Sequence, residues 1–376
     1  MNVVCPREHL AAALALAERA AAVGENLPVL GGVRLQAVQD HLELAATDLE
    51  ISVAARVAAR VEQPGSRVVD ARLFSALVRR LEGQEVELRA GSETSTLEVR
   101  AGGSRFSLVA MPADDFPELP RLDDGWRVQV PARQLEQAVA QSRFACAASD
   151  QRPVLSGVLV EVEGTQLRLV ATDSSRLAYR EVEGVGASPF GNPGLFVPRV
   201  IVPARALDEV RRICAGLEDD AVVMLALGER LAVLEAPSAT LATRLIEGNF
   251  PPYRQVFLDG LPSRVRFRRQ SLLDAVQRVA LLSRRGPAVV QIQVDGGQVL
   301  LRSAVPDAGE GEERVEAVAE GPGFTVAYQA RFLEDVLKAF GAEEVELELG
   351  DPARQGTFRI AGDPGYRYIV MPWRTG

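Results

Sequence analysis

The side chains in this 376-residue sequence that could do chemistry are few and lie far apart. The two histidines, His9 and His41, have no neighbours at the spacing of a metal site or a catalytic triad. We expect the cysteines Cys5, Cys146 and Cys214 to be small buried residues. They include no CxxC pair, and their odd number argues against a disulfide framework. No glycine-rich phosphate loop follows a predicted strand. The sequence therefore predicts no metal site, no cofactor and no nucleophilic catalysis.

Carboxylates are the remaining source of chemistry. Paired aspartates occur at 114–115, 123–124 and 219–220, and the segment EGEE occupies 310–313. All of them fall in predicted loops or turns, where charged runs are usually solvated. A two-metal nuclease would need several carboxylates converging on one point, which folding could still bring about. A non-catalytic binding protein is favoured over such an enzyme.

The composition indicates an ordinary folded protein of two or three domains. Hydrophobic residues make up 47% and charged residues 25% of a chain longer than one core usually serves. The sequence has no run of about 18 apolar residues that would span a membrane. Its first residues, MNVVCPREHL, lack the basic and apolar regions of a secretory signal. We expect a cytoplasmic protein without membrane contact.

The net charge of −9 argues at first against nucleic acid as a partner, since non-specific binders usually carry a basic excess. Net charge, however, does not say where the charges lie. Lys338 is the only lysine, and all other basic residues are arginines. We attribute that bias mainly to genome base composition.

The chain contains an internal repeat. Residues 28–48, PVLGGVRLQAVQDHLELAATD, align without a gap with residues 153–173, PVLSGVLVEVEGTQLRLVATD. A fainter third copy, VVQIQVDGGQVLLRSA, begins at Val289. Each copy alternates apolar and polar residues around a turn, which is typical of two half-buried strands. The repeat therefore predicts a strand hairpin that occurs three times.

Helices flank each hairpin in the same order. Amphipathic stretches at 7–21, 132–147 and 269–285 precede the three copies, and segments at 68–81, 201–214 and 325–340 follow them. Each following segment runs from a short strand into a helix through an Ala-Arg pair. The fold class is therefore α+β, with three similar domains in tandem. We place these domains at 1–122, 126–257 and 262–376.

Tandem domains of this size favour a binding protein over an enzyme. Solenoid repeats have a period of about 20–50 residues, whereas these units are large enough to hold separate cores. Similar domains in one chain tend to close by symmetry.

Seven segments of the sequence, in this order, resemble those of one family, the bacterial DNA polymerase sliding clamp, which is the beta subunit of DNA polymerase III. They are REHL (7–10), LPVLGGVRL (27–35), TDLE (47–50), SRFSL (104–108), ATDSSRLA (171–178), NFPPYRQV (249–256) and VMPWR (370–374). The resemblance covers the whole chain. It implies a ring-shaped head-to-tail homodimer with inner helices, outer antiparallel sheets and no cofactor or catalysis.

The resemblance also implies partners. The ring would encircle double-stranded DNA without sequence preference, be opened by an ATP-driven clamp loader and tether the replicative polymerase alpha subunit. Repair polymerases, ligase and mismatch-repair proteins would bind through linear peptide motifs. Such a protein would work at the nucleoid. A second clamp copy specialised for repair or inhibitor resistance is the alternative function.

Arginines on the predicted helices would supply weak contacts to DNA in the ring's channel. For any one of them, a solvated helix face is an equally good explanation. Gly24 and Pro153-Val154 stand where related clamps can carry DNA-contacting side chains. The predicted channel residues are Arg72, Arg79, Arg133, Arg143, Arg205 and Arg211.

A peptide pocket between the second and third domains is also implied. Apolar walls, an adaptable methionine and a few polar anchors suit an extended peptide. Ser174-Ser175 replaces a commoner Gly-His, and Gln255 stands where an arginine is often found. For Leu155 alone, a place in the core is the favoured alternative. The predicted pocket residues are Leu155, Thr172, Ser174, Ser175, Arg176, Leu177, Pro251, Gln255, Val256, Ile369, Met371, Pro372, Trp373 and Arg374.

The dimer seam would join Phe106 and Leu108 of one copy to Leu281 and Leu282 of the other. The alternative is that these residues pack within their own domains.

Overall fold

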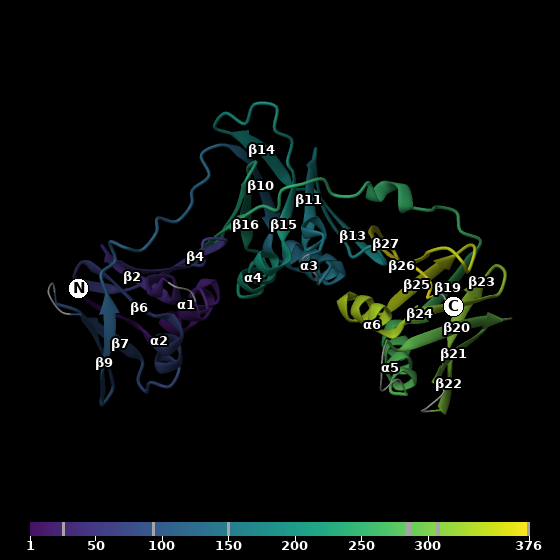
Figure 1. The fold of residues 1–376 in the computed structure, drawn as a ribbon, viewed down its shortest axis with the longest axis horizontal. Helices are drawn as coiled ribbons and strands as arrows, with labels where there is room; N and C mark the ends of the chain where they lie inside the picture. Colours follow the sequence, from purple (N-terminus) through teal and green to yellow (C-terminus); the bar gives the residue numbers. More distant parts are fainter. Residues whose placement is uncertain are drawn as a thin grey trace. The chain divides into compact units, whose positions relative to one another are not determined.

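The computed structural model describes residues 1–376 except 25–26, 92–94, 149–150, 283–286, 296, 306–308 and 374–376. The chain divides into two compact units. Figure 1 labels their helices and strands. The first unit contains Met1–Glu136, Gly186–Pro198 and Arg205–Leu245. The second contains Gln137–Val185, Arg199–Ala204 and Ile246–Gly376. The middle sequence repeat thus contributes to both units.

The first unit is built on a 14-stranded sheet with the order β14-β10-β16-β17-β18-β4-β3-β2-β6-β9-β8-β7-β1-β5. Its helices are α1 (Arg7–Ala20), α2 (Ala71–Val78) and α4 (Ala204–Ala215), with a 3-10 turn at Pro28–Gly31. Its strands are β1 (Asn2–Pro6), β2 (Gly32–Val38), β3 (His41–Thr47), β4 (Ile51–Ala58), β5 (Arg60–Gln63), β6 (Gly65–Asp70), β7 (Glu85–Arg89), β8 (Thr96–Ala101), β9 (Ser104–Met111), β10 (Gly125–Pro131), β14 (Gly186–Phe190), β16 (Val222–Leu227), β17 (Leu231–Glu235) and β18 (Ala239–Arg244).

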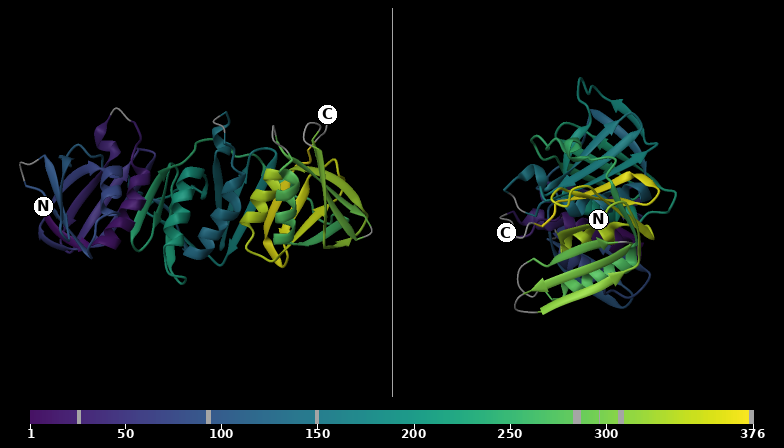
Figure 2. Two further views of the ribbon diagram at one scale, coloured as in Figure 1. Left: turned by 90° about the horizontal axis from the view of Figure 1, so that it is seen from below. Right: turned by 90° about the vertical axis from the view of Figure 1, so that its right-hand side faces the viewer.

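The second unit has a nine-stranded sheet, β15-β11-β12-β13-β27-β26-β25-β19-β23, and a four-stranded sheet, β22-β21-β20-β24. Figure 2 shows α5 and α6 side by side in this unit, and the two helices pack together. The helices are α3 (Ala132–Ser142, which begins in the first unit), α5 (Arg269–Ala280) and α6 (Ala330–Ala339), with 3-10 turns at Arg143–Ala145, Pro153–Leu155 and Tyr253–Val256 (η4). The strands are β11 (Gly157–Glu163), β12 (Gln166–Thr172), β13 (Arg176–Glu183), β15 (Arg199–Pro203), β19 (Ser263–Arg268), β20 (Val289–Asp295), β21 (Gln298–Val305), β22 (Gly309–Val315), β23 (Ala317–Glu320), β24 (Phe324–Gln329), β25 (Glu344–Leu349), β26 (Gly356–Ile360) and β27 (Asp363–Val370).

The predicted repeat is confirmed at the level of strand order. Three four-stranded rows share one connectivity: β6-β2-β3-β4, β15-β11-β12-β13 and β24-β20-β21-β22. In each row the two strands of the predicted hairpin come second and third, and the strand that follows the hairpin in the chain comes last. The rows β9-β8-β7-β1-β5, β18-β17-β16-β10-β14 and β27-β26-β25-β19-β23 share a second connectivity. Each repeat therefore consists of one row of each kind.

Neighbouring repeats are joined strand to strand. In the first unit β4 pairs antiparallel with β18, with Val53 opposite Leu241. In the second unit β13 pairs antiparallel with β27, with Leu177 opposite Ile369. Both junctions join the last strand of a four-stranded row to the last strand of the next repeat. Backbone hydrogen bonds of the sheet thus cross from one repeat to the next.

The predicted helices are present, and two end earlier than expected. On α1 the predicted stripe of Leu10, Leu14 and Ala17 is buried. The stretch 132–147 is helical only to Ser142, whose hydroxyl donates back to the Ala138 carbonyl at 2.7 Å. Such back-bonding competes with the helix ladder and often marks a bend. The stretch 269–285 is helical to Ala280.

Burial keeps two of the three cysteines inert. Cys5 and Cys214 are buried, whereas Cys146 is partly exposed, so the expectation of three buried cysteines is wrong for Cys146. Burial raises the pKa of Cys5 and of Cys214 to about 12. Both thiols therefore stay protonated at neutral pH and are poor nucleophiles. Within the described ranges, no group of His, Cys, Asp and Glu is placed to hold a metal ion. Among the same residues, no helix is long and apolar enough to cross a membrane.

Candidate functional site

The Thr-Asp pair that repeats in the sequence builds a tight turn. In the second unit Thr172 donates its hydroxyl to the Arg176 carbonyl at 2.6 Å and accepts the Ser174 amide at 3.1 Å. The Asp173 carboxylate accepts the amides of Ser175 and Arg176 at 2.9 and 3.0 Å. These side chains satisfy backbone groups that have no strand partner, which explains the need for Thr and Asp.

The first repeat contains the same turn. Thr47 donates its hydroxyl to the Ile51 carbonyl at 3.0 Å, and Asp48 accepts the Ile51 amide at 2.8 Å. Leu49 and Ser174 occupy the matching left-handed position, with φ of 74° and 80°. Glycine takes this conformation more easily. Ser174 is therefore held in a strained geometry by the bonds around it.

Arg176 is the buried centre of the predicted peptide pocket, with 3% of its surface exposed. Its guanidinium donates to the Asp173 carboxylate at 2.9 Å, to the Asp335 carboxylate at 2.6 Å and to the Phe144 carbonyl at 2.7 Å. It also lies over the Phe332 ring, 4.5 Å from the centroid. All three guanidinium nitrogens are thus engaged inside the protein. This arrangement favours a role in fixing the turn, whereas its predicted hydrogen bond to a peptide backbone stays a prediction.

Three apolar members of the predicted pocket belong to one core cluster. Leu155, Leu177 and Ile369 are buried together with Phe250 and Tyr253. In this structure Leu155 is therefore a core residue, which was the favoured alternative for it.

The remaining members lie at the surface around that cluster. The Met371 amide donates to the Ser175 carbonyl at 2.9 Å, which brings the tail to the Thr-Asp turn, and Met371 is 42% exposed. Pro372 and Trp373 are half-buried, and the Trp373 amide donates to the Ala327 carbonyl at 2.7 Å. Arg374 lies outside the described residues. We call the exposed members the peptide surface: Ser174, Ser175, Pro251, Gln255, Val256 and Met371.

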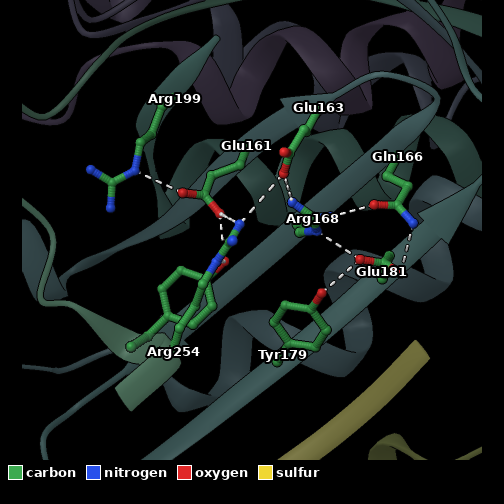
Figure 3. A network of polar contacts seen from close by, with 9 residues as sticks. Glu161, Glu163, Gln166, Arg168, Tyr179, Glu181, Arg199 and Arg254 are labelled. Carbon is green, nitrogen blue, oxygen red and sulfur yellow. Dashed lines mark hydrogen bonds and ion pairs between the residues drawn. The ribbon is translucent and has the colours of Figure 1, made fainter. Parts of the chain in front are cut away.

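A polar network that was not predicted from the sequence lies beside the core cluster of Leu155, Leu177 and Ile369 (Figure 3). Arg168 donates to Glu181 at 2.6 Å, and the Tyr179 hydroxyl donates to the same carboxylate at 2.7 Å. Burial opposes ionisation of Glu181, yet the hydrogen bonds from Arg168 and Tyr179 lower its pKa overall. Glu161 accepts from Arg199 at 2.7 Å and from the Tyr253 hydroxyl at 2.5 Å. Burial and the bond to Glu161 raise the pKa of Tyr253, so its hydroxyl stays protonated.

The sequence did carry one signal for this network. Glu161 and Arg168 stand at polar positions of strands whose other residues are mostly buried and apolar. Charges at such positions usually need partners. The partner on the distant segment, Tyr253, could not be read from strand alternation.

Five of the six predicted channel arginines lie in the first unit, and all five are exposed. Four of them carry an acidic neighbour. The pairs are Arg79 with Glu18 at 3.3 Å, Arg133 with Asp219 at 2.9 Å, Arg205 with Asp48 at 2.5 Å and Arg211 with Glu136 at 3.8 Å. In each pair the arginine side chain is at least half exposed, and ion pairs at the surface contribute about 0–1 kcal/mol each, so a phosphate could compete for the arginine. Arg72 is also exposed at the start of α2, and Arg143, in the second unit, is half-buried.

The predicted seam residues lie at or beside sheet edges. In the described residues, β9 from Ser104 to Val109 has only β8 as a neighbour, and Phe106 and Val109 are 42% and 79% exposed. Leu108, also on β9, is half-buried. In the other unit β22 has β21 as its single partner among the strands that the structure describes. Leu281, just after α5, is 77% exposed.

Leu282 differs from Leu281 in being half-buried. Its side chain lies against β22, where a Cβ added to Gly311 would come within 2.9 Å of the leucine Cδ1. Leu282 therefore packs within its own repeat. An open hollow of about 860 Å³ lies next to Leu281 and is lined by residues of α5 and α6.

Three family models match this chain in succession. They describe the N-terminal, central and C-terminal domains of the DNA polymerase III beta subunit and cover residues 1–120, 129–252 and 255–374. The beta sliding clamps of Caulobacter vibrioides and of Synechocystis are each 30% identical to this chain. Each match covers 100% of this chain, together with 100% of the Caulobacter protein and 99% of the Synechocystis protein.

Solved structures agree with these matches. A Pseudomonas aeruginosa sliding clamp bound to griselimycin has a TM-score of 0.91 at 30% identity, with 100% of this chain and 99% of that one covered. The Bacillus subtilis DNA polymerase sliding clamp has a TM-score of 0.89 at 26% identity, with both chains fully covered. The three repeats are thus three clamp domains, and the chain belongs to the family of the DNA polymerase III beta subunit, the beta sliding clamp, which is a non-catalytic processivity factor.

Proposed function

We propose that two copies of this chain close head to tail into a ring around duplex DNA. The observation that carries this proposal is the repeated junction. The pairs β4–β18 and β13–β27 join equivalent strands, and the same rule applied once more pairs β22 with β9. In the described residues, β22 and the Ser104–Val109 part of β9 each have a free edge. A second copy would satisfy both edges, because a head-to-tail contact that closes makes a ring. The domain bounds 1–122, 126–257 and 262–376 remain part of this proposal, and the ranges of the family models support them.

Exposed apolar side chains support the same seam. Phe106 and Val109 on β9 and Leu281 after α5 are all exposed. A free sheet edge with apolar side chains tends to pair with another chain. We propose that Phe106, Leu108 and Leu281 enter the seam, with Leu282 supporting β22 from inside its repeat.

The weak ion pairs of the helix arginines suit a protein that slides. A ring held by topology need not grip DNA, and each phosphate contact must break as the ring moves. The acidic total of −9 would repel stray DNA, while Arg72 and the paired arginines offer a salt-sensitive attraction.

We propose that polymerases bind the peptide surface through short linear segments. A relative from Pseudomonas aeruginosa has been solved bound to griselimycin, and we propose the same ligand for this surface. The replicative polymerase alpha subunit, the clamp loader, repair polymerases, ligase and mismatch-repair proteins are the proposed partners, at the nucleoid in the cytoplasm. A specialised second clamp copy stays the alternative, and none of the comparisons favours it.

Retention on DNA tests the ring. The protein is placed on nicked circular plasmid with its clamp loader, and the plasmid is then either left circular or cut once. We expect the protein to stay on circles through gel filtration and to leave cut DNA within minutes. Equal loss from both forms would contradict encirclement, whereas equal retention on both would indicate direct grip.

Truncating Met371 tests the peptide surface. Met371→Ala removes an exposed, adaptable apolar side chain, and we expect griselimycin affinity to fall about tenfold, or about 1.4 kcal/mol. Leu195→Ala is the matched control, because Leu195 is fully exposed and lies in the other unit. Calorimetric titration measures both. Wild-type affinity in the Met371 variant would remove this residue from the site.

A further inference from the structure

A segment without strands, residues 249–259, carries three members of the peptide surface; we call it the strap. It follows β18, which ends at Arg244, and precedes β19, which begins at Ser263. Its side chains face two ways. Phe250 and Tyr253 are buried, and Phe257 packs against the same cluster. Pro251, Gln255 and Val256 are exposed. The placement of the exposed side chains therefore depends on what holds the buried ones.

The strap is tied near both ends. Just before it, the Ile246 amide donates to the Ile201 carbonyl at 2.9 Å. Near its far end Gln355 donates to the Val256 carbonyl at 3.1 Å. Asp259 there pairs with Arg359 at 3.5 Å and with Arg367 at 3.1 Å. These ties hold the end of η4 at Val256 and the residues after it, and they leave the start of η4 to be fixed by Tyr253.

Tyr253 supplies the polar anchor of that part of the strap. Its hydroxyl donates to Glu161 Oε2, on strand β11, at 2.5 Å. Its ring packs on Tyr179 and Phe257, with centroids 6.0 and 5.7 Å away. The ring contacts are apolar and tolerate sliding, whereas a hydrogen bond to a carboxylate has one favoured length and direction.

Glu161 is itself held in place. Its side chain is 12% exposed, and its other oxygen accepts from Arg199 at 2.7 Å. Arg254, next to Tyr253, reaches both Glu161 and Glu163 at 4.0 and 3.6 Å but is 61% exposed. Of the contacts that Tyr253 and Arg254 make with Glu161 and Glu163, the one from the Tyr253 hydroxyl to Glu161 is the shortest and the best covered.

We propose that Tyr253 is a positioning residue for peptide binding. Its bond to Glu161 holds the strap in the geometry that an extended peptide needs, so that Pro251, Gln255 and Val256 present one wall of the site before the peptide arrives. A surface ordered in advance loses less conformational freedom on binding. The inference rests on the proposed peptide-binding function and assigns to that site a residue that does not touch the ligand.

Tyr253→Phe tests the proposal, with Tyr179→Phe as the matched control. Both changes remove one hydroxyl that donates to a glutamate of the network and keep the ring, but only Tyr253 lies on the strap. We expect griselimycin to bind the Tyr253 variant about fivefold more weakly. The effect is modest because the lost charge-assisted hydrogen bond orders the strap and does not touch the ligand. The Tyr179 variant should stay within about twofold of wild type. Titration calorimetry gives both affinities.

Hydrogen exchange separates positioning from general stability. In Tyr253→Phe the amides of the strap should exchange faster, while those of β12 and β13 keep their wild-type rates. Substitutions at Glu161, the hydrogen-bond partner of Tyr253, test whether a retained acceptor preserves griselimycin affinity. Glu161→Gln retains an acceptor for the tyrosine and should keep near-native affinity, whereas Glu161→Ala should match Tyr253→Phe. A double variant, Tyr253→Phe with Glu161→Ala, should be no weaker than the stronger single effect.

Two outcomes would overturn the proposal in different ways. If wild type binds griselimycin and Tyr253→Phe binds equally well, the positioning role is wrong and the peptide surface stands. If wild type does not bind, the proposed function of this surface fails and the positioning role fails with it. Equal weakening in Tyr253→Phe and Tyr179→Phe would show a general effect of the network and would also overturn the specific role of Tyr253.

Discussion

Phe106→Arg is expected to convert the ring into single chains. Phe106 lies on the free edge of β9, where the proposed seam would bury it against the second copy. An arginine there would be buried without a partner, which costs several kcal/mol. A cost of about 3 kcal/mol at each of the two seams, or about 6 kcal/mol in all, would weaken dimerisation about ten-thousand-fold. Sedimentation at micromolar concentration should then give the mass of one chain, and the variant should leave circular DNA as fast as linear DNA.

Two further variants make the seam test specific. Leu195→Arg adds the same charge at a fully exposed leucine that lies on neither β9 nor β22, and it should remain a dimer. Adding Leu281→Glu to Phe106→Arg places a carboxylate on the opposing side of the proposed seam and should restore part of the dimer. A Phe106→Arg protein with the full dimer mass would contradict the seam, and failure of the charge pair alone would move Leu281 out of it.

The repeated architecture could be predicted from the sequence because its signals are local. Alternation around a turn marks hairpin strands, and the Thr-Asp pair marks a turn whose hydrogen bonds lie within five residues. The structure confirms the three repeats for these reasons. Helix ends were less predictable. Ser142 terminates α3 early through its own bond to Ala138, although the apolar pattern continues past it.

The inner part of the candidate site could not be predicted, because its partners lie far apart in the chain. Motif matching selects Leu155 and Leu177 as pocket walls, which stays a prediction, but it does not reveal that both are buried against Phe250 and Tyr253 of the strap. No local pattern reveals that Tyr253 reaches Glu161, 92 positions away. The same holds for Asp335, which lies 159 positions from Arg176. Local rules identify strands and turns, whereas long-range pairs appear only once the sheets are assembled.

The proposed seam could be predicted from the sequence only in part. Phe106 and Leu281 were named from the resemblance, and the structure finds both exposed. Val109 was missed, although it is the more exposed side chain on β9. Which strand edges remain free follows from the order of the whole sheet, and that order is not a property of any one segment.

Arg176→Ala is expected to destabilise the second unit by about 3 kcal/mol. The change would leave the Asp173 and Asp335 carboxylates and the Phe144 carbonyl without their shared donor in a site where the arginine side chain is 2% exposed. Breaking a buried pair by removing one partner typically costs about 3–5 kcal/mol. The lower end applies because both aspartates are partly exposed, at 19% and 27%. The loss of Arg176 should also loosen the turn that holds Ser174 and Ser175.

Arg180→Ala is the matched control for this prediction, because Arg180 lies on the same strand, β13, and pairs with one carboxylate, that of Asp363. It should cost about 1–2 kcal/mol, because one partly buried carboxylate loses its partner in place of two carboxylates and a carbonyl. All five tyrosines of the chain lie in the second unit, so the tyrosine signal in a urea titration reports on that unit alone. Asp335→Asn should fall between the two arginine variants, since the amide oxygen still accepts a hydrogen bond while the charge is lost. If Arg176→Ala costs no more than Arg180→Ala, Arg176 does not hold the turn, and its guanidinium becomes available for the direct peptide contact that the sequence predicted.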